Sequence, residues 1–71
     1  MKFDMSIDDN YASFKDDESD VYVFVDSFDN KEFEVRIGTI EYSKKVGLIN
    51  TSNSTELNDQ LATLFRKFQG A

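Results

Sequence analysis

The most regular pattern of apolar residues lies near the C-terminal end of the chain. Apolar side chains recur there at the spacing of one helical face, and they are Leu57, Leu61, Leu64, Phe65 and Phe68. Asn53, three residues before Glu56, resembles a capping box, with Ser54 as the rival cap. The pattern predicts a helix from this cap to about Phe68, with Gly70 at the position of a C-terminal cap.

Alternating or uninterrupted apolar runs in the middle of the chain predict strands. Residues 21–28 begin Val-Tyr-Val-Phe-Val, a β-branched and aromatic run that is typical of a strand. A turn at residues 29–31 then leads to a returning strand over residues 32–42. The apolar phase of that strand changes after Ile37, so we expect a β-bulge at residues 38–39 that restores the register.

Three shorter segments complete the predicted fold. Residues 2–7 alternate apolar and polar side chains and predict a half-buried strand, and residues 46–50 predict a last short strand after a turn at 43–45. Residues 11–14 fit either a short strand or a helical turn. We therefore expect a single α+β domain over residues 1–71, with a meander-like antiparallel sheet of about four strands and one C-terminal helix on one face.

One helix of about 14 residues can cover only one face of such a sheet. In the strand over residues 21–28, Val21, Val23 and Val25 point one way, and Tyr22, Phe24 and Phe28 point the other way. The aromatic set is therefore a candidate interface for a second copy of the chain or for a target, together with Tyr11 or Phe14. The alternative is that residues 11–14 fold over it.

Charge is divided unevenly along the 71 residues, which carry a net formal charge of −6. Residues 1–34 hold eleven acids and three bases, a formal charge of −8, whereas residues 35–71 hold three acids and five bases, a formal charge of +2. Such asymmetry indicates a partner of opposite sign. The alternative is a soluble surface with Asp-rich turns. The candidate partner-binding acids are Asp16, Asp17, Glu18, Asp20, Asp26 and Asp29.

The composition argues against the common catalytic and metal-binding chemistries. The chain has no Cys and no His, which excludes thiolate and histidine nucleophile systems and the usual zinc sites. The acids at residues 16–20 have the spacing of a calcium loop, but Val21 stands where Gly is needed and Ser27 where a bidentate Glu is expected. We therefore predict no enzyme activity, no metal site and no cofactor.

Direct nucleic-acid binding is not predicted either, because the net charge is negative and phosphate contacts supply most nucleic-acid affinity. The bases that a small patch would need are Arg36, Lys44, Lys45, Arg66 and Lys67. No apolar run is long enough to span a membrane, and the acidic N-terminus does not have the pattern of a signal peptide, so a cytoplasmic protein is expected, in the host cell if the protein is viral.

These features lead to a hypothesis of a non-enzymatic, acidic protein-binding module. In size and charge the chain is similar to small acidic proteins of phages and mobile elements, which bind and block a host enzyme or defence complex. The expected target is a protein with a basic, nucleic-acid-handling surface, which Asp-rich edges could occupy as a nucleic-acid mimic. The alternatives are an antitoxin or immunity-type partner, and a self-associating assembly subunit or homodimer.

Overall fold

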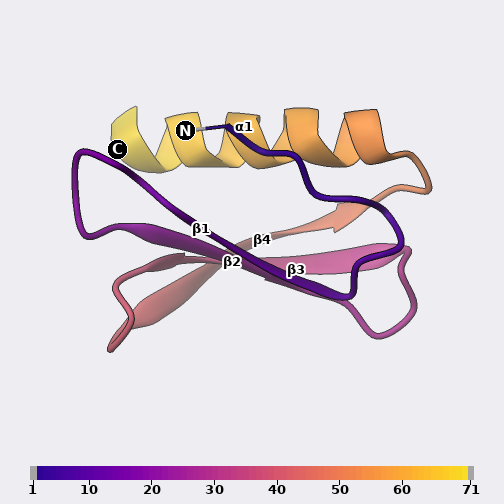
Figure 1. Cartoon of the computed structure of the whole chain (residues 1–71), viewed down its shortest axis with the longest axis horizontal. Coiled ribbons are helices and arrows are strands. Elements are labelled where there is room, and N and C mark those ends of the chain that lie inside the picture. Colours follow the sequence, from indigo (N-terminus) through magenta and orange to yellow (C-terminus); the bar gives the residue numbers. More distant parts are fainter. Residues whose placement is uncertain (1, 71) are drawn as a thin grey trace.

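Four antiparallel strands form one sheet, and their spatial order follows the sequence, β1-β2-β3-β4 (Figure 1). The computed structural model describes residues 2–70. The elements are β1 (Tyr11–Lys15), β2 (Tyr22–Asp26), β3 (Glu32–Gly38), β4 (Ser43–Asn50) and α1 (Ser54–Gly70). This arrangement confirms the predicted α+β class, the meander and the C-terminal helix. Within residues 2–70, no helix has both the length and the apolar character needed to cross a membrane.

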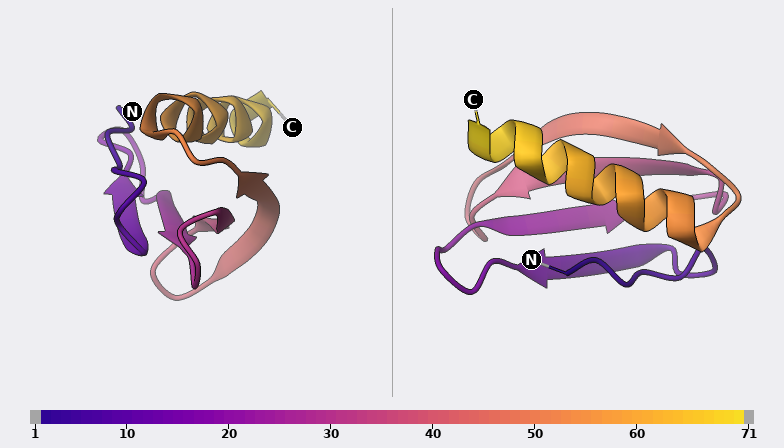
Figure 2. Two further views of the ribbon diagram at one scale, coloured as in Figure 1. Left: turned by 90° about the vertical axis from the view of Figure 1, so that its right-hand side faces the viewer. Right: turned by 90° about the horizontal axis from the view of Figure 1, so that it is seen from above.

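The core lies between α1 and one face of the sheet, which we call the inner face (Figure 2). Its most deeply buried side chains alternate along the two central strands and on β4, as a half-buried sheet requires, and they are Val23, Val25, Phe33, Val35, Ile37 and Ile49. Leu57, Leu61 and Phe65 complete the core from the helix. The predicted apolar stripe of the helix is thus confirmed, although Phe68 at its end is 39% exposed.

The helix begins as predicted and ends later. The side-chain oxygen of Asn53 accepts a hydrogen bond from the backbone N–H of Glu56 at 3.0 Å, so Asn53 is the N-cap. Ser54, the rival, instead accepts a hydrogen bond from the N–H of Ile7. Gly70 was expected as a C-terminal cap, but it is the last helical residue and does not have the positive φ that such a cap uses.

Residues 2–7 do not form the predicted strand. They run in an extended path beside α1 and close one side of the core with Met5, which is only 3% exposed (Figure 2). The side chain of Asn58 accepts from the N–H of Met5 and donates to its carbonyl, both at 2.9 Å. An amide side chain therefore replaces a neighbouring strand, and the alternation reflects burial without sheet pairing.

The sheet has a β-bulge, but it lies on β4 and not at residues 38–39 of β3, where it was predicted. Gly38 ends β3 and pairs with Ser43, and residues 39–42 form the turn that leads to β4. The register shifts opposite Val35 and Arg36, where Val46 is the extra residue of β4. The phase change in the sequence arose because residues 40 and 42 are exposed in the turn, and β4 starts at Ser43 rather than at Val46.

The segment of undecided structure, residues 11–14, belongs to the edge strand β1. Its register pairs Ala12 with Val25 and Phe14 with Val23, so these two side chains face the core. The segment therefore does not fold over the aromatic side chains of β2, and the face of the sheet that points away from α1 is not covered by it. The turn predicted at residues 29–31 is confirmed, but β2 ends at Asp26 rather than at residue 28, so the turn covers residues 27–31, with Asn30 at a positive φ of 58°.

Candidate interaction surfaces

The face of the sheet opposite the helix, which we call the outer face, is one candidate surface. Strand pairing aligns the residues of neighbouring strands in rows across it. The outer face consists of Tyr11, Ser13, Lys15, Tyr22, Phe24, Asp26, Glu32, Glu34, Arg36, Gly38, Ser43, Lys45, Leu48 and Asn50. In the part of the chain that the structure describes, α1 and residues 2–7 pack on the inner side, so no element covers this face.

Aromatic rings and an arginine occupy the centre of the outer face. The rings of Tyr22 and Phe24 are stacked, with centroids 5.7 Å apart and planes within 6°. The guanidinium carbon of Arg36 lies 5.9 Å from the Phe24 centroid, within cation–π range. A nitrogen of the same guanidinium lies 3.8 Å from a carboxylate oxygen of Asp26. The centre is therefore partly ordered before any partner binds.

The third predicted aromatic, Phe28, lies in the β2–β3 turn and is fully exposed. It lines a shallow hollow of about 190 Å³ together with Asp26, Glu34 and Leu48 of the outer face. Tyr22 and Phe24 thus lie on one strand face as predicted, while Phe28 extends that face beyond the end of β2. Strand periodicity alone did not identify Leu48 or Arg36 as neighbours of these rings, because that requires the register of β3 and β4.

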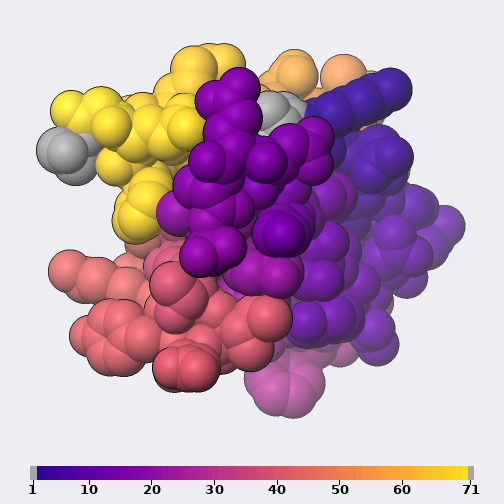
Figure 3. Space-filling model, turned by 60° about the vertical axis from the view of Figure 1, so that its left-hand side comes forward, coloured from indigo at the N-terminus to yellow at the C-terminus, as the bar shows by residue number. Residues whose placement is uncertain are grey.

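The second candidate surface is an acidic edge on the β1 side of the sheet. Because the strands lie in sequence order, the charge division in the sequence becomes a division in space. The acidic edge comprises the seven carboxylates that flank β1 in the chain, Asp4, Asp8, Asp9, Asp16, Asp17, Glu18 and Asp20. All are exposed except Asp16, which is half-buried. Figure 3 shows the β1–β2 loop (residues 16–21, purple) between the end of α1 and the β3–β4 hairpin.

The six predicted partner-binding acids form two groups rather than one. Asp16, Asp17, Glu18 and Asp20 share the β1–β2 loop at one end of the sheet. Asp26 and Asp29 lie at the far end of β2, about 17 Å away along a strand of five residues. The sequence places the first four acids in a loop and the last two at the end of the next strand, and the structure shows that this strand sets the two groups at opposite ends of the sheet.

Two of these acids also shape turns. Asp16 accepts hydrogen bonds from the N–H of Glu18 at 3.4 Å and from the Ser19 hydroxyl at 3.0 Å. Asp29 accepts from the N–H groups of Glu32 at 2.9 Å and Lys31 at 3.0 Å, and the Ser27 hydroxyl adds a longer bond. These donors lower the pKa of the Asp29 carboxyl below 3.8, and the N–H of Glu32 has the largest effect.

The pKa of Asp29 leads to a prediction about acid stability. A carboxyl whose pKa is lowered on folding stabilises the fold above its unfolded pKa, and this contribution is lost as the pH falls through the lowered folded value. We expect NMR titration to give Asp29 a pKa below 3.8. We also expect the Asp29→Asn variant to lose less stability than the parent when the pH is lowered from 5 to 2. Parallel acid-unfolding curves for the two proteins would contradict this role.

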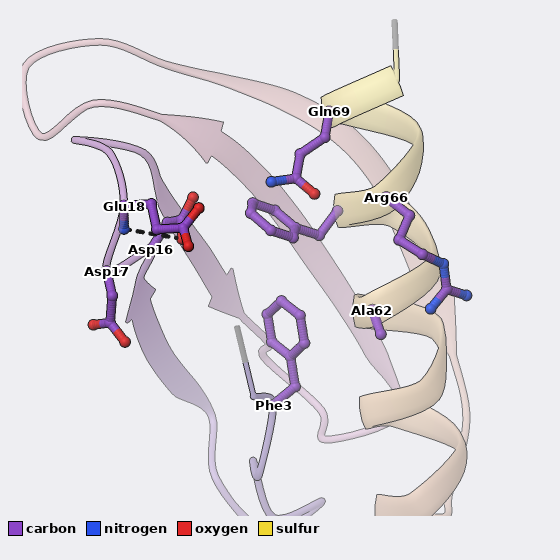
Figure 4. Close-up of a pocket in the computed structure, with 8 residues that line it drawn as sticks. Phe3, Asp16, Asp17, Glu18, Ala62, Arg66 and Gln69 are labelled. Atoms are coloured by element: carbon purple, nitrogen blue, oxygen red, sulfur yellow. Dashed lines mark hydrogen bonds between the residues drawn. The ribbon is translucent and has the colours of Figure 1, made fainter.

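A pocket of about 310 Å³ opens between the β1–β2 loop and the last turns of α1 (Figure 4). Phe3, Ala62 and Phe65 supply its apolar lining, and Asp16, Asp17 and Glu18 lie along the loop side. Arg66 belongs to the helical rim, but its guanidinium points away from the loop carboxylates and donates to the Thr63 hydroxyl at 3.3 Å. The pocket thus joins an aromatic floor to a carboxylate wall.

Sequence analysis did not identify the apolar part of this pocket. Phe3 was placed on a predicted strand and Phe65 in the helix core, which left no indication that the two rings meet. They lie in edge-to-face contact with centroids 6.1 Å apart, and Phe14 packs on Phe3 at 5.0 Å. Only the path of residues 2–7 beside α1 brings them to the acidic loop.

The basic side chains are partly brought together. Lys44, Lys45 and Lys67 line one hollow with Val46, Leu64 and Phe68, between β4 and the C-terminal half of α1, so Lys45 borders both this hollow and the outer face. Arg66 lies at the acidic pocket and Arg36 on the outer face. Among residues 2–70, no group of three or more carboxylates is arranged to hold a metal ion.

Comparison with known proteins gives no relative. No protein-family model, no curated protein and no solved structure matches this chain.

Proposed function

We propose that this chain is a non-enzymatic protein-binding module that docks its acidic edge on a basic surface of another protein. The class we favour is an inhibitor of phage or mobile-element type, which occupies a surface that its host target uses to handle nucleic acid. The observation that carries the proposal is the pocket between the β1–β2 loop and α1, because it combines apolar and anionic walls within the acidic edge.

This combination suits one long basic side chain of the target. The aliphatic stem of a Lys or Arg packs on the rings of Phe3 and Phe65, and its charged head reaches the carboxylate of Glu18, while the Asp17 carboxylate, on the other side of the loop, acts from a longer distance. The remaining acids of the edge steer the encounter over longer distances. Association is therefore expected to be fast at low salt and to slow as salt rises, because the Debye length is only about 8 Å at physiological ionic strength.

The proposal is tested with a matched pair of variants. Asp17→Asn/Glu18→Gln removes two exposed charges from the pocket, and Glu56→Gln/Asp59→Asn removes two exposed charges from the helix. Asp16 is left unchanged because it holds the loop. We expect the pocket variant to bind its target up to about tenfold more weakly, since two charge contacts of about 0.2–1 kcal/mol each are lost.

The target for this comparison is the protein that the immobilised parent captures from a lysate of the native host cell at low salt, identified by mass spectrometry. We expect duplex DNA to compete for that protein, and the pocket variant to have a flatter salt dependence than the helix variant. Equal affinities for the two variants across a salt series would contradict the acidic edge as the binding surface. Capture that duplex DNA does not affect would contradict the nucleic-acid-handling target.

A further inference from the structure

The charges of the outer face are balanced, unlike those of the chain as a whole. The outer face holds three bases, Lys15, Arg36 and Lys45, and three acids, Asp26, Glu32 and Glu34. Its formal charge is therefore zero in a chain whose net charge is −6. A surface with no net charge is where two copies of an acidic protein can approach with the least repulsion.

The six charges are also sorted along the strands. The bases lie in the two rows nearest the β3–β4 hairpin, where Lys15 shares a row with Tyr22, and Arg36 shares a row with Lys45. The acids lie in the two rows nearest the β2–β3 turn, where Asp26 pairs with Glu34. The strand residues of each outer face therefore form a basic half and an acidic half, and Asp20 and Glu41 lie beside Tyr22 at the outer end of the basic half.

We propose that two copies of this chain associate through their outer faces as a twofold-symmetric dimer. The axis lies in the plane between the sheets and runs across the strands, so that the strands of one copy are antiparallel to those of the other. A twofold axis parallel to the strands would instead place the basic halves together. The axis across the strands sets each basic half on the acidic half of the partner, as a self-complementary twofold interface requires.

In this arrangement the row of Arg36 faces the row of Glu34 from the second copy. Arg36 and Glu34 then form two reciprocal ion pairs, one on each side of the axis. The stacked rings of Tyr22 and Phe24 meet the region of Phe28 from the other copy, and the exposed Tyr11 and Leu48 flank the contact. Two sheets packed in this way lie about 10 Å apart with their strands about 30° from alignment.

The size of the face sets the expected strength. Four strands spaced about 4.8 Å apart give a platform about 19 Å wide and about 20 Å long. Two such faces, with the added surface of their protruding side chains, would bury on the order of 1,000 Å² in total. That area is at the lower end of specific interfaces, so we expect a micromolar dissociation constant. The apparent mass should rise from the 8.2 kDa of the chain toward twice that value as the concentration increases.

Charge exchange between Glu34 and Arg36 tests the geometry. Glu34→Arg places an arginine at both facing positions, and Arg36→Glu places a glutamate at both, so each variant alone should dissociate at least about tenfold more readily than the parent. An equimolar mixture of the two variants should associate again, because the two arginines of one chain then face the two glutamates of the other at these positions. The measurement is sedimentation velocity from about 1 μM to about 1 mM, a range that spans the expected affinity.

Circular dichroism controls for the fold, and renewed association of the mixture shows independently that both variants remain folded. The pocket variant Asp17→Asn/Glu18→Gln should dimerise like the parent, so a failure of the acidic edge and a failure of this dimer are distinguishable. A parent that stays monomeric throughout the concentration range would overturn the proposal and leave the outer face to a different protein. Single variants that dimerise as well as the parent would also overturn it.

Discussion

Replacing Leu61 by Ala is expected to remove most of the stability of this protein. Leu61 is fully buried at the middle of α1, against the inner face of the sheet. Truncation of such a leucine costs about 3–5 kcal/mol, because the transfer energy is lost and a cavity remains. A domain of this length has a total stability of about 4–10 kcal/mol. We therefore expect thermal unfolding, followed by circular dichroism, to occur at least about 15 °C below the parent.

Thr63 provides the matched control on the same helix. Its side chain is exposed and its hydroxyl donates to the carbonyl of Asp59 in its own helix. Thr63→Ala should change the free energy of unfolding by no more than about 0.5 kcal/mol. If Leu61→Ala melted within a few degrees of the parent, the assignment of the buried face of α1 would be wrong.

Replacing Gly38 by Ala is expected to have the second-largest effect. A Cβ atom at Gly38 would overlap the carbonyl oxygen of Tyr42 and would lie 2.6 Å from the Cα of Ser43. Both are backbone atoms of the β3–β4 hairpin, so neither can move without displacing the strand. We expect a loss of about 2–3 kcal/mol, the usual cost of inserting atoms into a closely packed site. The thermal midpoint should fall by about 10 °C or more.

Gly47 offers the comparison, because it lies in the neighbouring strand but meets flexible atoms. A Cβ atom there would have the methyl groups of Leu64 as its nearest neighbours, at 3.4 and 3.5 Å. A side chain can rotate by a few tenths of an ångström where a backbone cannot, so Gly47→Ala should cost less than about 1 kcal/mol. Equal losses for the two alanine variants would mean that close approach of the hairpin backbone is not what requires glycine at position 38.

The sequence predicted best where burial and hydrogen bonding follow the same local period. The stripe of Leu57, Leu61 and Phe65 and the cap at Asn53 are both confirmed, because both depend on residues within a few positions of one another. The alternation of β2 likewise separated Val23 and Val25 from Tyr22 and Phe24 correctly.

Prediction was wrong where the structure of a segment depends on contacts with residues far away in the sequence. Residues 2–7 alternate like a strand, but their backbone groups bond to the side chains of Asn58 and Ser54, more than 40 residues later. The displaced bulge has a similar cause, because the change of apolar phase after Ile37 rests on Ile40 and Tyr42, which are exposed at 73% and 77%.

The candidate surfaces were predictable in residue type but not in arrangement. Strand periodicity identified Tyr22 and Phe24 as the uncovered side of β2, yet the sorting of charge around them depends on the pairing of Arg36 with Lys45 and of Asp26 with Glu34. Register across several strands is a long-range property that no local spacing specifies. The aromatic floor of the acidic pocket depends in the same way on where Phe3 lies relative to Phe65.

The attachment of residues 2–7 to α1 has a consequence for synthesis of the chain in the cell. Residues 2–7 leave the ribosome before Ser54 and Asn58 and cannot be placed until then, because these two side chains bind them only after the helix has been made. At about 5–20 residues per second, translation of the intervening chain takes several seconds. During that time Phe3, Met5 and Ile7 have no helix to pack against and are accessible to chaperones. Any truncation before residue 58 would leave them in that state permanently.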